Sequence, residues 1–260
     1  GWVASGLAFL LVGAGIHITQ TVGLALATDL APEADQPKVV GLMYVMQLLG
    51  MIISALVFGW ALNEFSPAKL IQVIQASALI TIVLNVISLW KQEPRSQTNK
   101  KSSAEPSFID SWRTFAQGGN AMRRLVVLGF GTMAFSMNEV LLEPYGGQIL
   151  GMSVSDTTML TAILAAGGLI GFSWASRVLS KGTDPFFMAS MGALVGIPAF
   201  ILITLSAPLA LREIFFLGIF LIGFGGGLFS HGTLTATMQL APSDQRGLAL
   251  GAWGAVQATA

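Results

Sequence analysis

The chain has 260 residues, of which 53% are hydrophobic and 10% charged, and its formal net charge at pH 7 is zero. Soluble domains carry roughly 25% charged residues, so lipid rather than water must cover most of this surface. The absence of cysteine excludes disulfides, thiolate metal sites and cysteine nucleophiles. Because the chain starts at Gly1 inside one apolar run and stops at Ala260 inside another, we expect it to be a piece of a longer protein.

Apolar stretches of about 20 residues, the length that spans a bilayer, recur along the chain. They lie at 5–30, 39–62, 69–90, 122–143, 157–178, 186–205 and 212–238, and residues 247–260 resemble the start of an eighth. The sequence therefore predicts an all-α polytopic membrane protein with about eight transmembrane helices. Its partners should include membrane lipids, and we expect no nucleic acid among them.

An internal repeat relates residues 13–47 to residues 223–257 at a constant shift of 210 positions. Identical pairs include Leu30 and Leu240, Ala31 and Ala241, Pro32 and Pro242, Gly41 and Gly251, and Gln47 and Gln257. Each copy has the pattern of a Gly-rich apolar helix, a short polar loop and a second apolar helix. A long-period repeat in such an apolar chain indicates a membrane protein built from two related halves.

Lys and Arg are concentrated in alternate loops. All 13 of them except Lys69 and Arg212 lie in or beside the loops 31–38, 91–121, 177–185 and 241–246. Basic residues accumulate on the cytoplasmic side of short loops, so we expect these four loops to be cytoplasmic. Residues 1–30 then run inward, and the following segments alternate.

The segment 91–121 is the one long polar stretch, and it divides the chain into 1–90 and 122–260. Its Ser, Lys, Glu and Pro content indicates a flexible linker at its start. Phe108, Ile109, Trp112 and Phe115 recur at helical spacing, which favours a short amphipathic helix at the membrane surface. A plain linker throughout is the alternative.

Few polar side chains fall inside the apolar runs. A charge near the bilayer centre costs about 2.5–3.5 kcal/mol on insertion scales, so such residues usually face an interior or a cavity. The candidates are His17, Asn138, Glu139, Glu143 and His231. A histidine here could bond to a neighbouring helix, couple proton movement, or act as an axial ligand to the metal of a tetrapyrrole. Under the repeat His231 aligns with Thr21, one turn beyond His17 on the same helical face.

Glu139 and Glu143 are spaced i,i+4 on one helical face, just before Pro144, which we expect to end the helix. Two such carboxylates repel unless one is protonated or a cation lies between them. Glu143 alone would be accommodated in water at the outer interface, whereas Glu139, one turn deeper, favours a functional or partner-binding role. The run 144–147 then predicts a tight turn, with Tyr145 as an interfacial anchor at headgroup level.

Two of these runs carry a family resemblance. His17-x-x-Gln20-Thr21-x-Gly23-Leu24-Ala25 and Leu141-Leu142-Glu143-Pro144-Tyr145-Gly146-Gly147 resemble signatures of the PucC/LhaA family, a branch of the major facilitator superfamily found in anoxygenic phototrophic bacteria. The resemblance implies helices four to eleven of that bundle, with 1–90 ending the N-terminal half, 91–121 as the central cytoplasmic loop and 122–260 in the C-terminal half. It also places His17, Glu139, Glu143 and His231 on helices that line a central cavity.

The resemblance implies a membrane assembly factor for bacterial light-harvesting complexes, located in the cytoplasmic or intracytoplasmic photosynthetic membrane. Its expected partners are antenna polypeptides and the reaction centre–antenna complex, and its expected ligands are bacteriochlorophyll and carotenoid. His17 or His231 would then be an axial ligand to the pigment magnesium, and Gln20 and Tyr145 join the other candidates for binding pigment or substrate.

Two other functions compete with this interpretation. A proton-coupled secondary transporter of a small solute or pigment precursor would use Glu139, Glu143 or the histidines. The loop 176–184, however, lacks the full Gly-x-x-x-Asp-Arg-x-Gly-Arg-Arg pattern common in transporters of the superfamily. An enzyme of pigment synthesis ranks last, because the sequence shows no metal-binding cluster, no nucleophile–base pair and no aspartate-rich diphosphate motif. We therefore expect no enzymatic activity.

Overall fold

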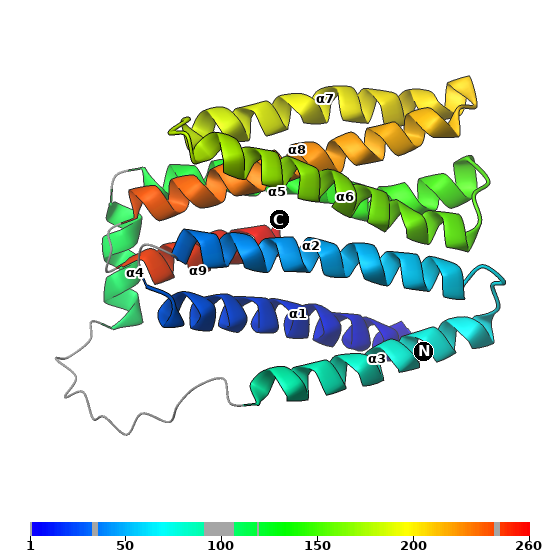
Figure 1. Cartoon of the computed structure of the whole chain (residues 1–260), viewed down its shortest axis with the longest axis horizontal. Coiled ribbons are helices and arrows are strands. Elements are labelled where there is room, and N and C mark those ends of the chain that lie inside the picture. The colour runs from blue at the N-terminus through cyan, green and yellow to red at the C-terminus, as the bar shows by residue number, and fades with distance from the viewer. Residues whose placement is uncertain (1, 33–35, 91–106, 119, 242–244) are drawn as a thin grey trace.

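The computed structural model describes residues 2–32, 36–90, 107–118, 120–241 and 245–260. These residues form a bundle of long helices lying side by side, with one short helix placed crosswise at one end (Figure 1). In chain order the helices are α1 (Trp2–Leu30), α2 (Gln36–Ala61), α3 (Pro67–Leu89), α4 (Phe108–Gln117), α5 (Ala121–Pro144), the π-helix η1 (Tyr145–Ile149), α6 (Val154–Leu179), α7 (Pro185–Leu209), α8 (Arg212–Leu240) and α9 (Arg246–Thr259).

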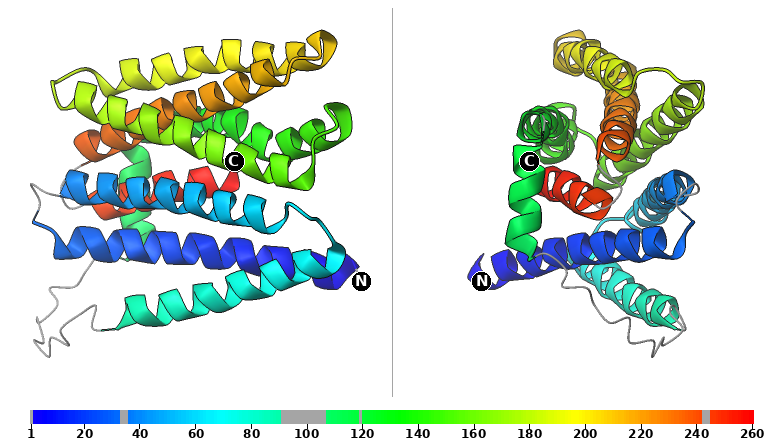
Figure 2. Two further views of the ribbon diagram at one scale, coloured as in Figure 1. Left: turned by 45° about the vertical axis from the view of Figure 1, so that its right-hand side comes forward. Right: turned by 90° about the vertical axis from the view of Figure 1, so that its left-hand side faces the viewer.

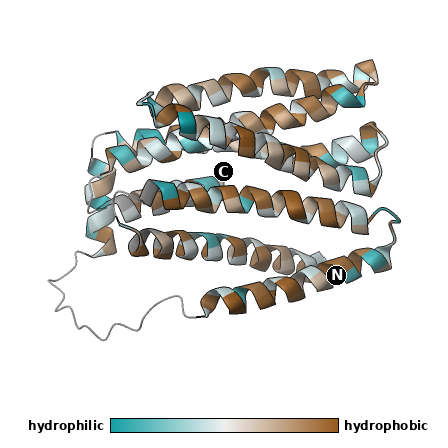
Figure 3. Ribbon diagram, in the orientation of Figure 1, coloured by the Kyte–Doolittle hydropathy of each residue, from teal (hydrophilic) through white to brown (hydrophobic). Residues whose placement is uncertain are grey.

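Seven helices in the described part of the chain are long and apolar enough to cross a membrane. They are α1, α2, α3, α5 with η1, α6, α7 and α8, while α9 has 14 residues. Apolar residues cover the outward surfaces of the bundle (Figure 3), and many large apolar side chains of α1 and α3 are more than half exposed. The prediction of an all-α polytopic membrane protein is confirmed.

The helix ends are sorted between the two ends of the bundle. The C-terminal ends of α1, α3, α6 and α8 lie at one end, together with α4 and the start of α5 (Figures 1 and 2). The α2–α3, η1–α6 and α7–α8 connections lie at the opposite end. This alternation is the geometry that the distribution of Lys and Arg predicts, and we call the first end the basic end. That this end faces the cytoplasm stays a prediction.

Helix α4 crosses the basic end of the bundle (Figure 2). Ser107 caps it, accepting a hydrogen bond from the backbone N–H of Asp110 at 3.3 Å. The ring of Trp112 lies 6.5 Å from that of Phe108 and 5.8 Å from that of Phe115, so the aromatic residues share one face. The sequence predicts an amphipathic helix from 108 to 115, and the structure has a helix over these residues.

The two copies of the repeat have the same helix boundaries. Helix α1 ends at Leu30 and α8 at Leu240, while α2 begins at Gln36 and α9 at Arg246, so both boundaries keep the 210-residue shift. Matched residues also share an environment, because Val40 of α2 and Leu250 of α9 are buried in the same apolar cluster. The repeat is therefore structural as well as sequential.

Helix α8 lies between α6 and α7 and packs extensively on both. Its glycines bring backbone against backbone: a β-carbon at Gly223 would collide with the carbonyl oxygen of Leu164 in α6, and one at Gly225 with that of Gly192 in α7. In lipid, where apolar side chains gain little by leaving the solvent, such close van der Waals contact is a main source of helix association. The glycine pattern thus determines the position of α8.

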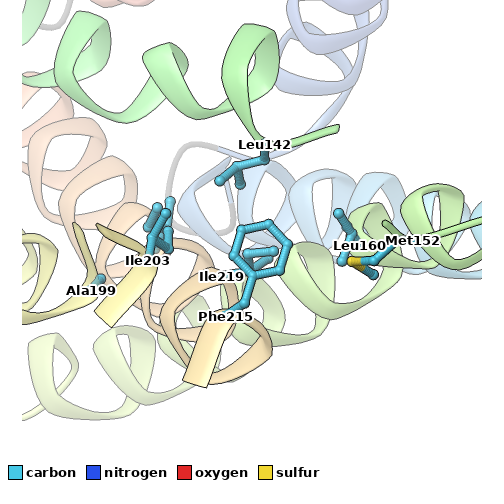
Figure 4. Close-up of a cluster of buried hydrophobic side chains, with 8 residues drawn as sticks. Leu142, Met152, Leu160, Ala199, Ile203, Phe215 and Ile219 are labelled. Atoms are coloured by element: carbon cyan, nitrogen blue, oxygen red, sulfur yellow. The ribbon is translucent and has the colours of Figure 1, made fainter. Parts of the chain in front are cut away.

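The end of the bundle opposite the basic end is held by an apolar cluster from four helices and a loop (Figure 4). Its buried members are Leu142, Met152, Leu160, Ala199, Ile203, Phe215, Ile219 and Ile222. The guanidinium of Arg212 donates to the carbonyl oxygens of Leu150 and Gly151 at 3.1 and 3.4 Å, which ties the η1–α6 loop to the start of α8.

The expected tight turn after Pro144 is wrong. The helix instead continues as η1 to Ile149, and the N–H of Leu150 donates to the carbonyl oxygen of Tyr145 at 3.2 Å. Pro144 lacks an N–H, and the wider π-helical turn closes bonds five residues apart in place of the regular pattern. Tyr145 packs against α7 and α8, because its hydroxyl donates to the carbonyl oxygen of Ile203 at 3.3 Å and its ring packs against Phe215. That Tyr145 lies at headgroup level stays a prediction.

The predicted orientation can be tested with single cysteines at the two ends. Asn63 and Gln117 are both exposed and lie at opposite ends of the bundle. In right-side-out membrane vesicles we expect a membrane-impermeant maleimide to label Asn63→Cys but not Gln117→Cys, and to label both after detergent permeabilisation. The reverse pattern would show that the basic end faces outward.

The glycine contacts of α8 predict a position-specific loss of stability. Gly223→Ala should destabilise the protein by about 1–3 kcal/mol, because the added methyl group forces α8 away from α6. Gly226→Ala is the matched control, since its β-carbon would meet only the Phe135 ring at an ordinary 3.7 Å. Thermal unfolding in detergent should show a lower midpoint for the first variant and an unchanged or higher midpoint for the second. Equal midpoints would contradict the packing argument.

Candidate functional site

A cavity of about 430 Å³, the central cavity, lies between α1, α2, α5, α6, α8 and α9. Aromatic, small and polar neutral side chains surround it. Its aromatic members are Tyr44, Phe135, Phe172, Phe229 and Trp253, and its polar members are His17, Gln20, Thr21, Gln47, Thr132, Ser136, Asn138, Ser230 and Gln257. This size lies within the range of small-molecule sites.

The polar groups of the central cavity, apart from the imidazole of His17, are hydroxyls and amides. None of the described residues that line it is Asp, Glu, Lys or Arg. The side-chain amide of Gln20 donates to Gln47 Oε1 at 3.4 Å, linking α1 to α2. An amide can donate to carbonyl or ester oxygens and accept from hydroxyl groups without requiring a charged partner. The cavity is therefore suited to a neutral ligand with a few polar substituents.

Stacked aromatic rings make one wall of the central cavity rigid. The ring of Tyr44 stacks on Phe172 at 5.7 Å and meets the edge of Trp253 at 5.9 Å. Trp253 is 1% exposed, and its indole N–H donates to the hydroxyl of Thr233 at 3.2 Å. Because α2, α6, α8 and α9 each contribute to this contact set, the wall links both copies of the repeat.

Glycines of α6 and α8 form another wall. Gly168, Gly223, Gly226 and Gly227 all line the central cavity. Three of them also make the backbone contacts between α6 and α8, whereas Gly226 leaves room for a β-carbon. Gly226 is therefore the glycine of this wall at which a ligand can approach the helix backbone.

Three of the residues predicted from the sequence meet at this cavity. His17 and Gln20 line it from α1, and Asn138 lines it from α5. Asn138 is 6% exposed, and its side-chain amide donates to the backbone carbonyl of Phe135. The side chain of His17 is exposed within the described residues.

His231 lies elsewhere. It lines a second cavity of about 630 Å³ between α2, α6 and α8, which we call the basic groove. Its ring meets the edge of Phe172 at 4.1 Å, and its Nδ1 is buried without a hydrogen-bond partner in the described part of the chain. Phe172 lines both cavities and separates them. The structure thus places the two imidazoles in different cavities rather than in one shared interior.

The remaining candidates do not reach the central cavity or are not described. Glu143 is exposed, and Tyr145 belongs to the apolar end cluster, where it packs on Phe215 at 5.5 Å. The side chain of Glu139 lies outside the described residues. Over the residues that can be searched, no group of three His, Asp or Glu side chains could hold a metal ion.

Sequence reasoning missed Tyr44, Gln47, Trp253 and Gln257 as members of the site. The two glutamines carried a usable signal, since they match across the repeat and both line the central cavity. A polar residue kept in both copies of a membrane-spanning helix pair has a reason to face inward. Tyr44 and Trp253 carried no such signal, because aromatic residues in apolar runs are ordinary.

Comparison with known proteins identifies the family to which the chain belongs. A family model described as "PUCC protein" matches residues 1–260. The chain belongs to the PucC protein family. The resemblance seen in the sequence is thereby confirmed.

Named PucC relatives match this family member over its whole length. It is 60% identical over 263 residues to protein PucC of Rhodovulum sulfidophilum, covering 100% of this chain and 58% of that protein. It is 56% identical over 261 residues to protein PucC of Cereibacter sphaeroides, covering 100% and 57%. A more distant relative, named "Bacteriochlorophyll synthase 44.5 kDa chain" in Rhodobacter capsulatus, is 25% identical over 269 residues, covering 98% and 61%. The chain thus spans less than two thirds of the length of these relatives.

The central cavity of this PucC family member should be chemically accessible. The sequence has no cysteine, so each introduced thiol is the one reactive thiol in the chain. Ser230→Cys, in the cavity wall, should react with a small membrane-permeant maleimide, because Ser230 is half-buried and lines the cavity. Ser206→Cys is the control, since Ser206 is 0% exposed and lies within the packed bundle. Mass spectrometry of the labelled protein measures both, and equal labelling would contradict an accessible cavity.

Proposed function

We propose that this PucC family member is part of a membrane assembly factor for bacterial light-harvesting complexes. In this proposal the central cavity receives bacteriochlorophyll, and the outer apolar faces hold antenna polypeptides in the photosynthetic inner membrane. Family membership supports the biological setting. The observation that carries the ligand class is a cavity with one imidazole and several amides, and with no Asp, Glu, Lys or Arg among its described lining residues.

The residues of the central cavity fit the chemistry of a magnesium tetrapyrrole. The neutral imidazole of His17 would supply an axial ligand, as histidine does for metals in many proteins. Gly226, where a β-carbon would find room, would let the macrocycle approach the backbone, and Gln47 and Gln257 would bond to its carbonyl groups. The absence of formal charge among the described lining residues favours a neutral pigment over an ionic solute.

The outer surface of α1 and α3 supports the holding of single-span polypeptides. None of the described residues of α3 is buried. On α1 a β-carbon added at Gly6, Gly13 or Gly15 would meet no atom within 4 Å among the described residues. Small residues on an open apolar face allow close approach of another transmembrane helix. We propose that an antenna polypeptide packs on α3; the relatives are longer than this chain, so the open face of α1 is also available to the rest of the same protein.

Non-enzymatic action completes the proposal. The name of the distant relative refers to bacteriochlorophyll synthesis, and we connect this chain to the same pigment as cargo rather than as product. Holding a pigment requires shape, an axial ligand and exclusion of water, all of which the central cavity could provide. Proton-coupled transport is the competing function, because His17 is titratable and lines the same cavity.

Pigment retention tests the proposal. We expect the protein, purified in mild detergent from phototrophically grown cells, to carry bacteriochlorophyll and to bring antenna polypeptides with it. His17→Phe should lower the pigment-to-protein ratio at least severalfold, because a phenyl ring cannot ligate magnesium. His231→Phe is the matched control and should retain the pigment, since His231 lies in the basic groove. Absorption spectra and mass spectrometry measure pigment and polypeptides.

Two outcomes would contradict the proposal. If the native protein carried neither pigment nor antenna polypeptides, the proposed assembly role would be contradicted. Proton-driven solute uptake in sealed vesicles, abolished by Glu139→Gln, would instead support the transporter.

A further inference from the structure

The basic groove contains a chemistry that the central cavity lacks. Lys38 of α2 and Arg177 of α6 line it, together with the hydroxyls of Ser173, Ser176 and Ser180. No acidic residue is found among its described lining residues. A groove with two cations and several hydroxyl donors is complementary to an anion that has several oxygen acceptors.

The polarity of the basic groove changes with depth. Lys38 lies two residues after the start of α2, Arg177 two residues before the end of α6, and Gln239 one residue before the end of α8. All three helix ends lie at the basic end of the bundle. Deeper in the groove Val45 and Leu234 form an apolar strip on α2 and α8, while Ser173, Thr235 and His231 are polar.

Phe172 and His231 mark the inner limit of the groove. His231 lies nine residues before the end of α8, which corresponds to roughly 13 Å of helix. Over this distance the α2 and α8 sides are mainly apolar between Lys38 and the Phe172 ring, and serine hydroxyls run along the α6 side. That arrangement matches an amphiphile lying parallel to the helices, with its charged head at the membrane surface and a chain directed inward.

We propose that the basic groove binds one anionic phospholipid. Its phosphate would contact Arg177 and the serine hydroxyls of α6, and one acyl chain would lie along Leu42, Val45, Leu234 and Met238. Basic pockets between transmembrane helices at the membrane surface bind anionic headgroups in this way. The proposal concerns a site separate from the central cavity and does not depend on pigment binding there.

Lipid retention on the pigment-free protein tests the proposal. The probe is an equal mixture of phosphatidylglycerol and phosphatidylcholine in mixed micelles, with native mass spectrometry counting the lipids retained. Wild-type protein should retain phosphatidylglycerol in preference. Arg177→Gln should lower this retention about fivefold, the effect of one basic residue near a membrane surface. Arg123→Gln, an exposed arginine that does not line the groove, should behave as the wild type.

A second variant separates a bound lipid from general surface charge. Leu42 is exposed and lines the groove, so Leu42→Trp should fill the space for the chain without changing charge or folding. It should also lower phosphatidylglycerol retention, and thermal unfolding checks that both variants are folded. Retention unchanged by Leu42→Trp, or lowered equally by Arg123→Gln, would overturn the proposal. Release of the lipid by excess inorganic phosphate would assign the site to free phosphate instead, and that too would overturn it.

Discussion

The backbone contact of α8 with α6 and α7 is the constraint on which the rest of the structure depends. Gly223 faces the carbonyl oxygen of Leu164, and Gly225 faces that of Gly192, at separations that no β-carbon could share. In water the hydrophobic effect of burying large apolar side chains would favour such packing, but between helices in lipid this contribution is small. Close van der Waals contact between the helix backbones at the glycines stabilises the packing instead. The two cavities then lie beside the glycine contacts, one on each side of Phe172.

Much of the fold could be predicted from the sequence, because span length and repeat period depend on the chain alone. The 210-residue shift recovered the ends of α1 and α8 and the starts of α2 and α9. The turn after Pro144 could not be read in the same way. Pro, Tyr and two glycines have the composition of a tight turn, but the side chain of Tyr145 bonds to α7, 58 residues away. Tertiary contact therefore decided the local conformation.

The residues of the site were predicted only in part, because the sequence does not give the rotation of each helix about its own axis. Hydropathy and cost arguments identify which polar residues must avoid lipid, and two of the residues so identified, His17 and Asn138, line the central cavity. These arguments do not give the rotation of a helix about its axis, which side-chain packing decides. Helix α8 turns His231 toward α2 and α6, although Thr21, its repeat counterpart, lines the central cavity. The two copies of the repeat thus share helix boundaries, but matched residues do not always line the same cavity.

The separation of charge between the two cavities has a physical consequence for function. Lys38 and Arg177 lie near helix ends, where water and headgroups offset the cost of their charge. The central cavity lies deeper in the bundle and is lined by amides, hydroxyls and aromatic rings. A neutral ligand bound there brings no charge into the apolar layer of the membrane. Holding or releasing such a ligand is then insensitive to the membrane potential, which acts only on charges that move across the membrane. Binding and release of a neutral pigment require no charge to move across the membrane. Proton-coupled transport, in contrast, requires a titrating group in the ligand path. His17 is the one histidine among the described residues that line the central cavity.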